Sequence, residues 1–357
     1  MKVLMTCDAV GGVWQYANDL SRALASEGVE IVLAVLGPCS LSSEGHRGVT
    51  TILSTDLPLD WLASGPQEVL HAGRAIAALA AEHEVDLIHL NSPALAAAGS
   101  FPTSVVAVAH GCVGTWFAAQ HEEVPADLAW HVDLVRAGLN VADAVVAPSA
   151  GYAAAVRDRY DLGSTPQVVH NGRTPAALPD IPPSDHVFTA GRLWDRVKNA
   201  GLLDEVAALL PVPFRAAGPV TAPHGETFTA RHLALLGVLD EPDLAAEYAQ
   251  APIFVAAAMF EPFGLAVLEA AQAGCPLVLS GIDTFSELWT GAALLVTDDE
   301  PQAYAAAIER IRFEPGLRQH LSEGARTRAT RYTPAAMAQG MLAIYRDLLA
   351  QPERRAA

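Results

Sequence analysis

The feature that most limits how this chain can fold is a proline-rich stretch between two similar halves. Residues 175–183 read PAALPDIPP, with four prolines in nine positions. Proline lacks a backbone N–H and has a fixed φ, so this stretch suits an extended connector rather than a helix or an inner strand. A chain of 357 residues is also too long for one ordinary core. We therefore predict two domains, residues 1–174 and 187–333, joined by a linker at 175–186.

Both halves alternate apolar runs of strand length with segments of helical periodicity. This alternation predicts two α/β domains, each with a doubly wound parallel sheet. A last helix is predicted in the segment 334–357, where it is long enough to pack across both lobes. The predicted strands lie near 3–6, 31–36, 86–90, 104–109, 144–147 and 167–169, and near 187–189, 214–217, 234–236, 253–256, 277–279 and 293–296; helical patterns include 13–27, 67–83, 126–139 and 334–349.

Composition and charge exclude several classes of protein. The sequence is 51% hydrophobic and 17% charged, which is typical of a folded globular chain and not of a disordered one. A formal net charge of −18 argues against a nucleic-acid-binding surface, because such surfaces are basic. The first 183 residues are themselves acidic, which opposes docking on anionic lipid. We expect no nucleic-acid partner.

The four cysteines and the N-terminal residues bear on location and metal binding. Cys7, Cys39, Cys112 and Cys275 are isolated, without zinc-ligand spacing, so we expect reduced thiols and no structural metal. No apolar run approaches the 18 residues of a membrane span, and a charge at Asp8 precedes any signal-peptide core. These patterns predict a cytoplasmic protein with no membrane span.

A glutamate pair frames an otherwise apolar segment, EPFGLAVLE at 261–269. From Leu265 to Ala273 the side chains are apolar nearly all round, which predicts a buried helix that ends at Gly274. A buried carboxylate needs a cation, a hydrogen-bond donor or a ligand as compensation. For Glu269 we favour a ligand, held beside the free N–H groups where the helix begins at Gly264. A structural ion pair with an arginine is the alternative.

Basic residues follow the first strand of the second half. The chain has only two lysines, Lys2 and Lys198, and Lys198 lies in a turn that begins Gly191-Arg192. Ligands of open α/β sheets bind at the carboxyl ends of strands, where this turn is expected. The guanidinium of Arg192 and the ammonium of Lys198 suit phosphate oxygens, so they are candidates to clamp a diphosphate. A solvated basic turn is the alternative.

The first half offers two further candidates and one chemistry that we discount. Gly11-Gly12 follows the first strand and permits close approach to an anion or a sugar, although a simple tight turn has the same pattern. His110 follows the strand at 104–109, again at a carboxyl end, with a purely structural histidine as the alternative. Ser149 and Cys112 lack a nucleophile elbow and an evident base, so a hydrolase triad is disfavoured.

Taken in order, these motifs resemble glycosyltransferase family 4. That family consists of retaining transferases that use nucleotide-sugars and have the GT-B fold, in which two Rossmann-like domains face each other across a cleft. Its most specific mark is a pair of glutamates with seven residues between them, matched here by Glu261 and Glu269. The resemblance runs nearly the full length and includes Gly11-Gly12, His110-Gly111, Val145 to Ser149, Val168 to Gly172, Gly191-Arg192, Lys198-Asn199 and Ala217-Gly218.

The resemblance implies a role for each candidate. Arg192 and Lys198 would grip the donor diphosphate, Glu261 would orient the transferred sugar, and His110 would lie near its C6 side. The resemblance implies further contacts with the donor. Glu269 would accept from the ribose hydroxyls, Leu239 would lie against the base, Gly11 and Gly12 would lie near the phosphates, and the backbone N–H groups of Phe263, Gly264 and Leu265 would hold sugar hydroxyls.

The resemblance also implies a reaction. A hexosyl group would move from a nucleotide-sugar, with UDP-glucose or a similar UDP-sugar expected, to a hydroxyl of a sugar, glycan, lipid-linked glycan or small molecule. Because no nucleophile is evident, attack on the face that the diphosphate leaves is the expected route to retention, without a metal or other cofactor. Alternatives are a GT-B sugar-nucleotide epimerase and a catalytically silent subunit that binds nucleotide-sugars.

Overall fold

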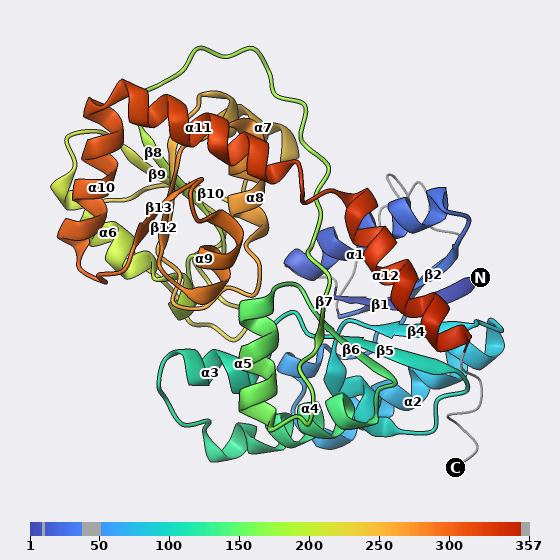
Figure 1. Cartoon of the computed structure of the whole chain (residues 1–357). Coiled ribbons are helices and arrows are strands. Elements are labelled where there is room, and N and C mark those ends of the chain that lie inside the picture. Colours follow the sequence, from blue (N-terminus) through green and yellow to red (C-terminus); the bar gives the residue numbers. More distant parts are fainter. Residues whose placement is uncertain (9–10, 38–50, 351–357) are drawn as a thin grey trace. The chain divides into compact units, whose positions relative to one another are not determined.

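The structure is a computed structural model, and it describes residues 1–8, 11–37 and 51–350. Its internal contacts divide the chain into two compact units (Figure 1). Unit 1 consists of Met1–Gly172 together with Thr333–Ala357, and unit 2 is Arg173–Tyr332. The proline-rich residues 175–186 contain no helix or strand. The chain therefore leaves unit 1 once, completes unit 2, and returns to unit 1 for its last described helix.

Unit 1 has a seven-stranded parallel sheet in the order β3-β2-β1-β4-β5-β6-β7. Its strands are β1 (Lys2–Asp8), β2 (Glu30–Leu36), β3 (Thr51–Ser54), β4 (Leu87–Leu90), β5 (Ser104–Val108), β6 (Ala144–Ala147) and β7 (Gln167–Val168). Its helices are α1 (Gly12–Ser26), α2 (Pro66–Glu82), α3 (Val113–Ala119), α4 (Ala129–Val141), α5 (Ala150–Tyr160) and α12 (Pro334–Leu349), with short 3₁₀ turns at Asp60–Leu62, Pro93–Ala98 and Ala126–Leu128.

The core of unit 1 joins residues from both ends of the chain. Helices α1 and α12 pack side by side and share one core cluster with the strands. Leu20 of α1 and Met341 of α12 are both fully buried in that cluster. Burying two such side chains removes apolar area from water and stabilises the unit by roughly 3–6 kcal/mol. The segment 333–349 is thus part of the core of unit 1 and not an appendage.

Unit 2 has a six-stranded parallel sheet in the order β10-β9-β8-β11-β12-β13. Its strands are β8 (Val187–Ala190), β9 (Phe214–Ala217), β10 (Ala234–Gly237), β11 (Ile253–Ala256), β12 (Leu277–Ser280) and β13 (Leu294–Val296). Its helices are α6 (Ala200–Leu209), α7 (Glu241–Ala249), α8 (Leu265–Ala273), α9 (Asp283–Trp289), α10 (Pro301–Phe313) and α11 (Pro315–Ala329), with a 3₁₀ turn at Arg196–Lys198.

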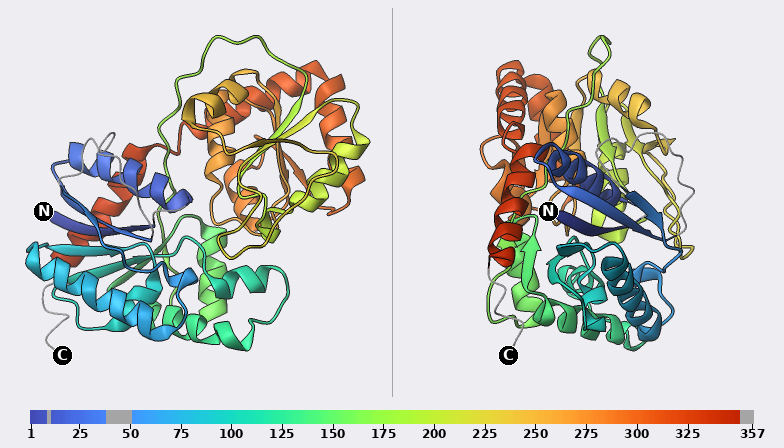
Figure 2. Two further views of the ribbon diagram at one scale, coloured as in Figure 1. Left: turned by 180° about the vertical axis from the view of Figure 1, so that it is seen from behind. Right: turned by 90° about the vertical axis from the view of Figure 1, so that its right-hand side faces the viewer.

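Successive residues of the strands in unit 2 bury opposite faces of its sheet. Phe188 and Phe254 belong to the cluster that includes residues of α7, α8, α9 and α11, whereas their neighbours Val187 and Val255 belong to the cluster with α6 and α10. Side chains of a strand alternate between its faces, so an apolar residue at every position is what a sheet covered on both sides requires. Helices lie on both faces of this sheet in Figure 2.

The structure confirms the predicted α/β class, and all the predicted strands are present. The main omission is β3, the edge strand Thr51–Ser54, which the apolar pattern did not reveal. The helix predicted at 126–139 is a 3₁₀ turn followed by α4. In the parts of the chain that the structure describes, no helix combines the length and the apolar character needed to cross a membrane. Cys39 lies outside the described residues.

Candidate functional site

The strand order of unit 2 defines where a ligand would bind. Numbered from its first strand, the sheet has the order 3-2-1-4-5-6, so the direction of chain progression reverses between β8 and β11. In open α/β sheets the loops that follow the strands at such a switch point separate and leave room for a ligand. The loop after β8 carries Arg192 and Lys198, and the loop after β11 carries Glu261. The topology therefore brings together two motifs predicted from separate parts of the sequence.

Contacts between these two loops are direct. Lys198 Nζ lies 2.5 Å from Glu261 Oε2, and the side chains are 23% and 17% exposed. The backbone N–H of Met259 donates to Val197 O at 2.8 Å and fixes one loop against the other. Lys198 is therefore not a solvated turn residue, which was the alternative from the sequence. It forms an ion pair at the carboxyl edge of the sheet.

Arg192 is held by a buried acid that the sequence analysis did not single out. Arg192 Nη2 donates to Asp195 Oδ2 at 2.7 Å, and its guanidinium lies 5.5 Å from the ring centre of Trp194. Asp195 is only 2% exposed, whereas the arginine side chain is 45% exposed. Asp195 also begins the 3₁₀ turn that ends at Lys198, since its other oxygen accepts from Val197 N. One acid thus orders the loop that carries both basic residues.

Helix α8 begins and ends at glycines, as predicted. Gly264 has a φ of 92° at its start and Gly274 a φ of 81° at its end. Both values lie in the left-handed region that glycine adopts without strain. Leu265 is the first helical residue, and the backbone N–H groups of this first turn have no partner within the helix. Phe263 is 2% exposed and packs edge-on against Tyr332, which anchors this turn in the core.

The structure corrects the interpretation of Glu269. We favoured a ligand as the compensation for this carboxylate, but Arg173 Nε donates to Glu269 Oε1 at 2.7 Å. A second nitrogen of Arg173 lies 3.5 Å from Glu241, and Gln272 donates to the Arg173 carbonyl at 2.8 Å. Glu269 is also less buried than expected, since its side chain is 20% exposed. The arginine alternative therefore holds, because the first residue of unit 2 folds back onto α8.

Two further parts of unit 2 border this edge. Gly218 follows β9 and lies close to the turn after β8. A Cβ atom at Gly218 would lie 1.8 Å from Gly191 O. Only glycine fits that approach. Leu239, predicted to meet a base, follows β10, where it is half-buried and packs against the core cluster that contains α8. Its position is compatible with that prediction but does not test it.

Unit 1 has the same kind of switch point, between β1 and β4. Gly11, with a φ of 87°, precedes α1, and Gly12 is its first residue; the two residues before them lie outside the described parts of the chain. Asn91 directly follows β4, and its backbone N–H donates to Thr6 Oγ1 of β1 at 2.8 Å. His110 follows the neighbouring β5. The predicted residues of unit 1 therefore also gather at the carboxyl edge of their sheet.

His110 belongs to a buried polar network that the sequence analysis missed. Its Nε2 lies 2.8 Å from Asn91 Oδ1, and the same oxygen lies 3.0 Å from His89 Nε2. His89 Nδ1 in turn contacts Tyr345 Oη of α12 at 2.6 Å, and Tyr16 packs edge-on against His110 at 4.4 Å. Burial, with a smaller contribution from His89, lowers the pKa of His110 to about 3. The signal that was overlooked is a histidine within the apolar strand at 86–90.

Two acids also lie at this edge of unit 1. Burial raises the pKa of Asp8 to about 7, and the nearby charge of Asp60 adds to the effect. Burial opposes ionisation of Asp60 as well, but bonds from His131 at 3.0 Å and Ser92 at 2.7 Å outweigh it and lower the pKa of this carboxyl. Asp60 is therefore the ionised member of the pair, and Asp8 takes up a proton near neutral pH.

The residues discounted as nucleophiles have structural contacts. The Ser149 hydroxyl accepts from Tyr152 N at 3.1 Å and so caps α5. Cys112 Sγ lies 2.9 Å from the hydroxyl of Tyr160. In residues 1–8, 11–37 and 51–350, no group of three or more His, Cys, Asp or Glu side chains has an arrangement that would hold a metal ion.

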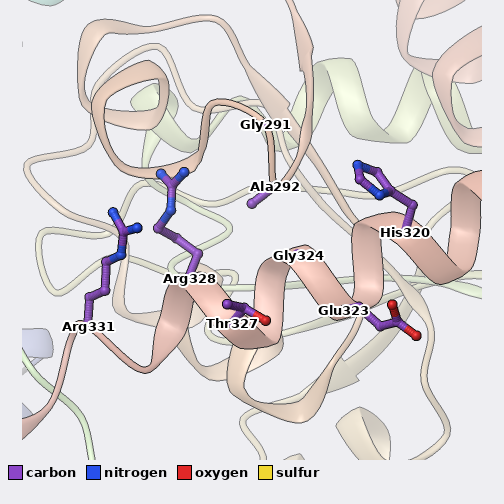
Figure 3. Close-up of a pocket in the computed structure, with 8 residues that line it drawn as sticks. All are labelled: Gly291, Ala292, His320, Glu323, Gly324, Thr327, Arg328 and Arg331. Atoms are coloured by element: carbon purple, nitrogen blue, oxygen red, sulfur yellow. The ribbon is translucent and has the colours of Figure 1, made fainter.

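A surface cavity in unit 2 lies away from these residues. It has a volume of about 290 Å³ and is lined by parts of α11 and the turn after α9 (Figure 3). Of the two arginines in its lining, Arg328 and Arg331, Arg328 already donates to Leu288 O at 2.7 Å and to Thr290 O at 3.0 Å. These bonds satisfy carbonyls at the end of α9, so Arg328 has a structural role there.

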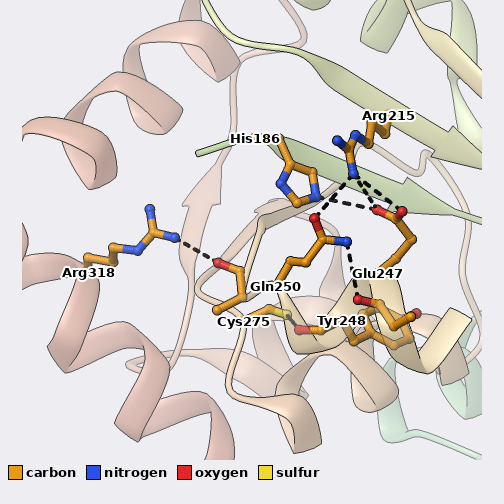
Figure 4. Close-up of polar contacts among 9 residues, drawn as sticks. His186, Arg215, Glu247, Tyr248, Gln250, Cys275 and Arg318 are labelled. Carbon is orange, nitrogen blue, oxygen red and sulfur yellow. Dashed lines mark hydrogen bonds and ion pairs between the residues drawn. The ribbon is translucent and has the colours of Figure 1, made fainter. Parts of the chain in front are cut away.

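A polar cluster also lies at the opposite, amino edge of the sheet in unit 2 (Figure 4). His186 precedes β8 and is 1% exposed, with Nε2 at 3.5 Å from Glu247 Oε2. Arg215 of β9 contacts the same carboxylate at 3.2 Å and Gln250 at 3.4 Å. Burial lowers the pKa of His186, Arg215 adds to the shift, and Glu247 opposes it. This cluster connects strands to α7 and contains none of the predicted site residues.

Comparison with known families gives two matches along the chain. Residues 10–176 match the family described as Glycosyltransferase Family 4. Residues 184–312 match the family described as Glycosyl transferases group 1. The first match falls within unit 1 except for its last four residues, and the second falls within unit 2.

Among characterised proteins, similar sequences span nearly the whole chain. The glycogen synthase of Mycobacterium tuberculosis is 25% identical over 90% of this chain and 87% of its own length. The D-inositol 3-phosphate glycosyltransferase of Frankia alni is 28% identical over 95% of each chain.

Solved structures of similar fold also cover the whole chain. Sucrose-phosphate synthase from Thermosynechococcus elongatus has a TM-score of 0.80 at 20% identity, covering 98% of this chain and 99% of that one. Anabaena Alr3699/HepE in complex with UDP and glucose has a TM-score of 0.76 at 18% identity, covering 98% and 100%. At these identities the similarity establishes the fold alone.

Proposed function

Because this chain belongs to the family 4 glycosyltransferases with the GT-B fold, we propose that it is a retaining hexosyltransferase that uses a nucleotide-sugar donor. The observation that carries the proposal is the Lys198–Glu261 ion pair at the switch point of unit 2. It joins a cation suited to phosphate and a carboxylate suited to sugar hydroxyls at the place where open α/β sheets bind ligands.

In this proposal the donor diphosphate binds at the loop after β8. Lys198 and Arg192 each have a carboxylate partner, and a diphosphate would compete for both cations. When the diphosphate takes Lys198, the carboxylate of Glu261 becomes available to accept from hydroxyls of the transferred sugar. The backbone N–H groups of Phe263, Gly264 and Leu265, at the start of α8, add donors for the same sugar. An ion pair in the absence of donor thus becomes two separate contacts in its presence.

Glu269 serves the ribose in this proposal, with Arg173 as its permanent partner. A carboxylate has about four lone-pair sites, so the bond from Arg173 Nε and bonds from two ribose hydroxyls are compatible. The arginine also balances the charge of the carboxylate, and a charged acceptor forms stronger hydrogen bonds than a neutral one. Leu239 supplies an apolar surface for the base. UDP is the proposed nucleotide, supported by the complex of Anabaena Alr3699/HepE with UDP-glucose.

In unit 1, His110 would contact the transferred sugar near C6, and Gly11 and Gly12 would allow close approach of the phosphates. The reaction breaks the bond between the anomeric carbon and the diphosphate oxygen and forms a bond from that carbon to the acceptor hydroxyl oxygen. The hydroxyl proton goes to the departing phosphate, on the same face. Lys198 and Arg192 offset the charge that develops on the diphosphate, and no metal or other cofactor is required.

His110 is not the base in this mechanism. Its ring stays neutral at neutral pH because burial lowers its pKa to about 3. A group with so low a pKa takes up a proton poorly at pH 7, whereas it accepts or donates hydrogen bonds well. This is one reason to assign deprotonation of the acceptor to the leaving phosphate.

The proposal is tested by incubating the purified protein with UDP-, ADP- and GDP-sugars, with and without glycan and small-molecule acceptors. We expect release of UDP that is unaffected by EDTA, together with a product whose anomeric configuration, measured by NMR, matches that of the donor. Inversion of configuration would contradict the proposed mechanism. Conversion of the donor to an epimer without acceptor, or binding with no turnover, would contradict the proposed function.

A further inference from the structure

The orientation of the Asn91 side chain is fixed by the backbone of β1. Asn91 Nδ2 lies 2.6 Å from Thr6 O. A carbonyl oxygen can only accept a hydrogen bond, so the atom that faces it must be the amide NH₂. Oδ1 is therefore the atom that faces the two imidazole rings. The hydrogen-bonding pattern alone therefore distinguishes the amide oxygen of Asn91 from its amide nitrogen.

The amide oxygen then determines where both histidines carry their protons. It lies within hydrogen-bond distance of His89 Nε2 and His110 Nε2, at 3.0 and 2.8 Å. An amide oxygen only accepts, so each Nε2 must carry a hydrogen. Both rings are neutral at pH 7, because burial lowers the pKa of His89 to about 4 and that of His110 to about 3. Each Nδ1 is consequently a bare acceptor.

The two acceptors have different surroundings. His89 Nδ1 is satisfied by the hydroxyl of Tyr345, which must donate to it at 2.6 Å. His110 Nδ1 has no hydrogen-bond partner among the residues that the structure describes. It is also not among the fully buried polar atoms that lack a partner there, so this nitrogen is not fully buried. His110 is half-buried, and Tyr16 packs edge-on against its ring. Its Nδ1 lone pair is thus available to a ligand at the switch point of unit 1.

We propose that Asn91 is a positioning residue for His110, which it holds with the proton on Nε2 so that Nδ1 accepts a hydrogen bond from a hydroxyl group of the sugar substrate. The inference rests on the proposed function in one respect, that His110 faces a sugar. It assigns roles that the family resemblance did not include. His89, Tyr345 and Thr6 act behind Asn91, and they connect the site residue to α12 and β1.

This arrangement has a consequence for selectivity. The only N–H of the His110 ring is taken by Asn91, so the ring offers no hydrogen to an anion. A hydroxyl can donate to Nδ1, whereas a phosphate or carboxylate oxygen would meet a lone pair. The His110 ring therefore favours a hydroxyl group over an anion, whereas the basic side chains of unit 2 suit anions.

The first experiment measures the proton positions directly and needs no substrate. NMR of the full-length protein labelled with ¹⁵N-histidine distinguishes protonated from bare ring nitrogens, and His110→Gln identifies the signals of His110. At pH 7 we expect His110 to be neutral, with a protonated Nε2 and a bare Nδ1. A protonated Nδ1 would overturn the inference, whatever reaction the enzyme catalyses.

The second experiment alters Asn91. Asn91→Leu removes the acceptor, so we expect the Nδ1–H form of His110 to appear by NMR and kcat/KM for the nucleotide-sugar to fall about tenfold, the effect of one lost hydrogen bond of ordinary strength. The control is Asn18→Leu. Asn18 is also buried in unit 1 and its amide also donates to a backbone carbonyl, Trp14 O at 2.9 Å, so it should lose stability to a similar extent but retain kcat/KM.

A third variant, Asn91→Asp, separates positioning from folding. A carboxylate beside the ring stabilises the imidazolium, so Nδ1 gains a proton at low pH and loses it as the pH rises. The titratable groups around His110 are His89 of β4, Tyr16 of α1 and, through His89, Tyr345 of α12. Because the pKa of His110 starts at about 3 and one opposite charge raises it by about 1–3, we expect kcat/KM of this variant to fall by up to about tenfold from pH 8 to pH 5, while Asn91→Leu stays uniformly low.

The results separate the two proposals. Wild-type kcat/KM at all pH values in both Asn91 variants would refute the positioning role and leave the transferase proposal intact. Absence of any glycosyl transfer by the unmodified protein would refute the proposed function, and the NMR result would still decide the proton positions. If Asn91→Leu does not fold, the unmodified protein and Asn91→Asp provide the decisive measurements.

Discussion

The two sheets have corresponding strand orders at their switch points, yet the side chains there differ in kind. At the edge of unit 1, the neutral groups of His110, Asn91 and His89 form a chain of hydrogen bonds, and the acid pair Asp8 and Asp60 has one ionised member. At the edge of unit 2, the predicted residues form ion pairs, such as Lys198 with Glu261. The fold sets the place where chemistry occurs, and the side chains after the strands set which ligand suits each place.

The difference also concerns what a ligand must displace. In unit 2 an anion competes with carboxylates for Lys198 and Arg192, which are 23% and 45% exposed, so exchange requires little desolvation. In unit 1, His89 and Asn91 are at most 5% exposed and their bonds are internal. Such a network has one arrangement that satisfies all its members. We therefore expect unit 2 to rearrange its pairs when a donor binds and unit 1 to keep its network.

The largest expected effect is in unit 2, from Lys198→Met. Loss of a charge-assisted hydrogen bond to the diphosphate costs about 1.5–3 kcal/mol, so kcat/KM for the nucleotide-sugar should fall roughly tenfold to a hundredfold or more. Arg196→Met is the matched control, because Arg196 is an exposed cation two positions away on the same turn. Equal kcat/KM in the two variants would show that the charge of Lys198 does not contribute to catalysis.

A second effect concerns the pair between Arg173 and Glu269. Glu269→Gln should weaken nucleotide binding about tenfold, because a neutral amide accepts more weakly than a carboxylate from ribose hydroxyls. Arg173→Met should weaken it less, since the carboxylate remains. Isothermal titration of UDP in a double-mutant cycle measures the coupling between the two. Unchanged UDP binding in Glu269→Gln would mean that the pair is only structural.

A third prediction concerns the charge of Asp8 at the carboxyl edge of the sheet in unit 1. The pKa of Asp8 is raised from 3.8 to about 7, so between these values the folded protein holds a proton that the unfolded chain releases. Its free energy of unfolding should therefore fall as the pH rises from 4 to 7. Asp8→Asn should remove at least about 1 kcal/mol of this loss at pH 8 and have little effect at pH 4.

Chemical denaturation at several pH values measures this difference. Asp133→Asn, which changes an exposed carboxyl of α4, is the control and should leave the pH dependence intact. If Asp8→Asn behaves like the control, Asp8 is already ionised well below neutral pH. The edge of unit 1 would then carry two negative charges, on Asp8 and Asp60, and the contrast with unit 2 would be weaker.

The smallest expected effect is at the amino edge of unit 2, where ionic contacts also occur. The pKa of His186 is lowered, so the folded state resists the proton that the unfolded chain takes up below pH 6.5. Stability should therefore be lost as the pH falls through that value, and His186→Phe should reduce this loss. We expect its kcat/KM to equal that of the unmodified protein. A catalytic defect would show that the two edges of this sheet are not independent.

The fold was largely predictable because its strands are short apolar runs. Ile253–Ala256 has the predicted bounds, since buried parallel strands must be apolar on both faces. The edge strand β3 was missed because Thr51–Ser54 has only two apolar residues and none of the four is fully buried. An apolar pattern in the sequence indicates a buried element, so a partly exposed edge strand is harder to predict.

Candidate residues could be named from the sequence, but the contacts between them could not. Lys198 and Glu261 were identified from their motifs, although nothing in the sequence states that they meet. Arg173 was missed as the partner of Glu269 because the two are 96 positions apart, and an arginine at the start of a connector has no distinctive pattern. Asn91 was missed although His89 in an apolar strand indicated a buried polar group that required a partner.

The return of the chain at Thr333 has a consequence for how the protein forms on the ribosome. Unit 2 is continuous from Arg173 to Tyr332, whereas Tyr345 and Met341, both 0% exposed, complete unit 1 only after all of unit 2 has been translated. Until then the apolar residues of unit 1 that pack against α12 are not covered by it, and His89 lacks its hydrogen-bond donor, the phenol of Tyr345. The half that is made first is therefore the half that matures last.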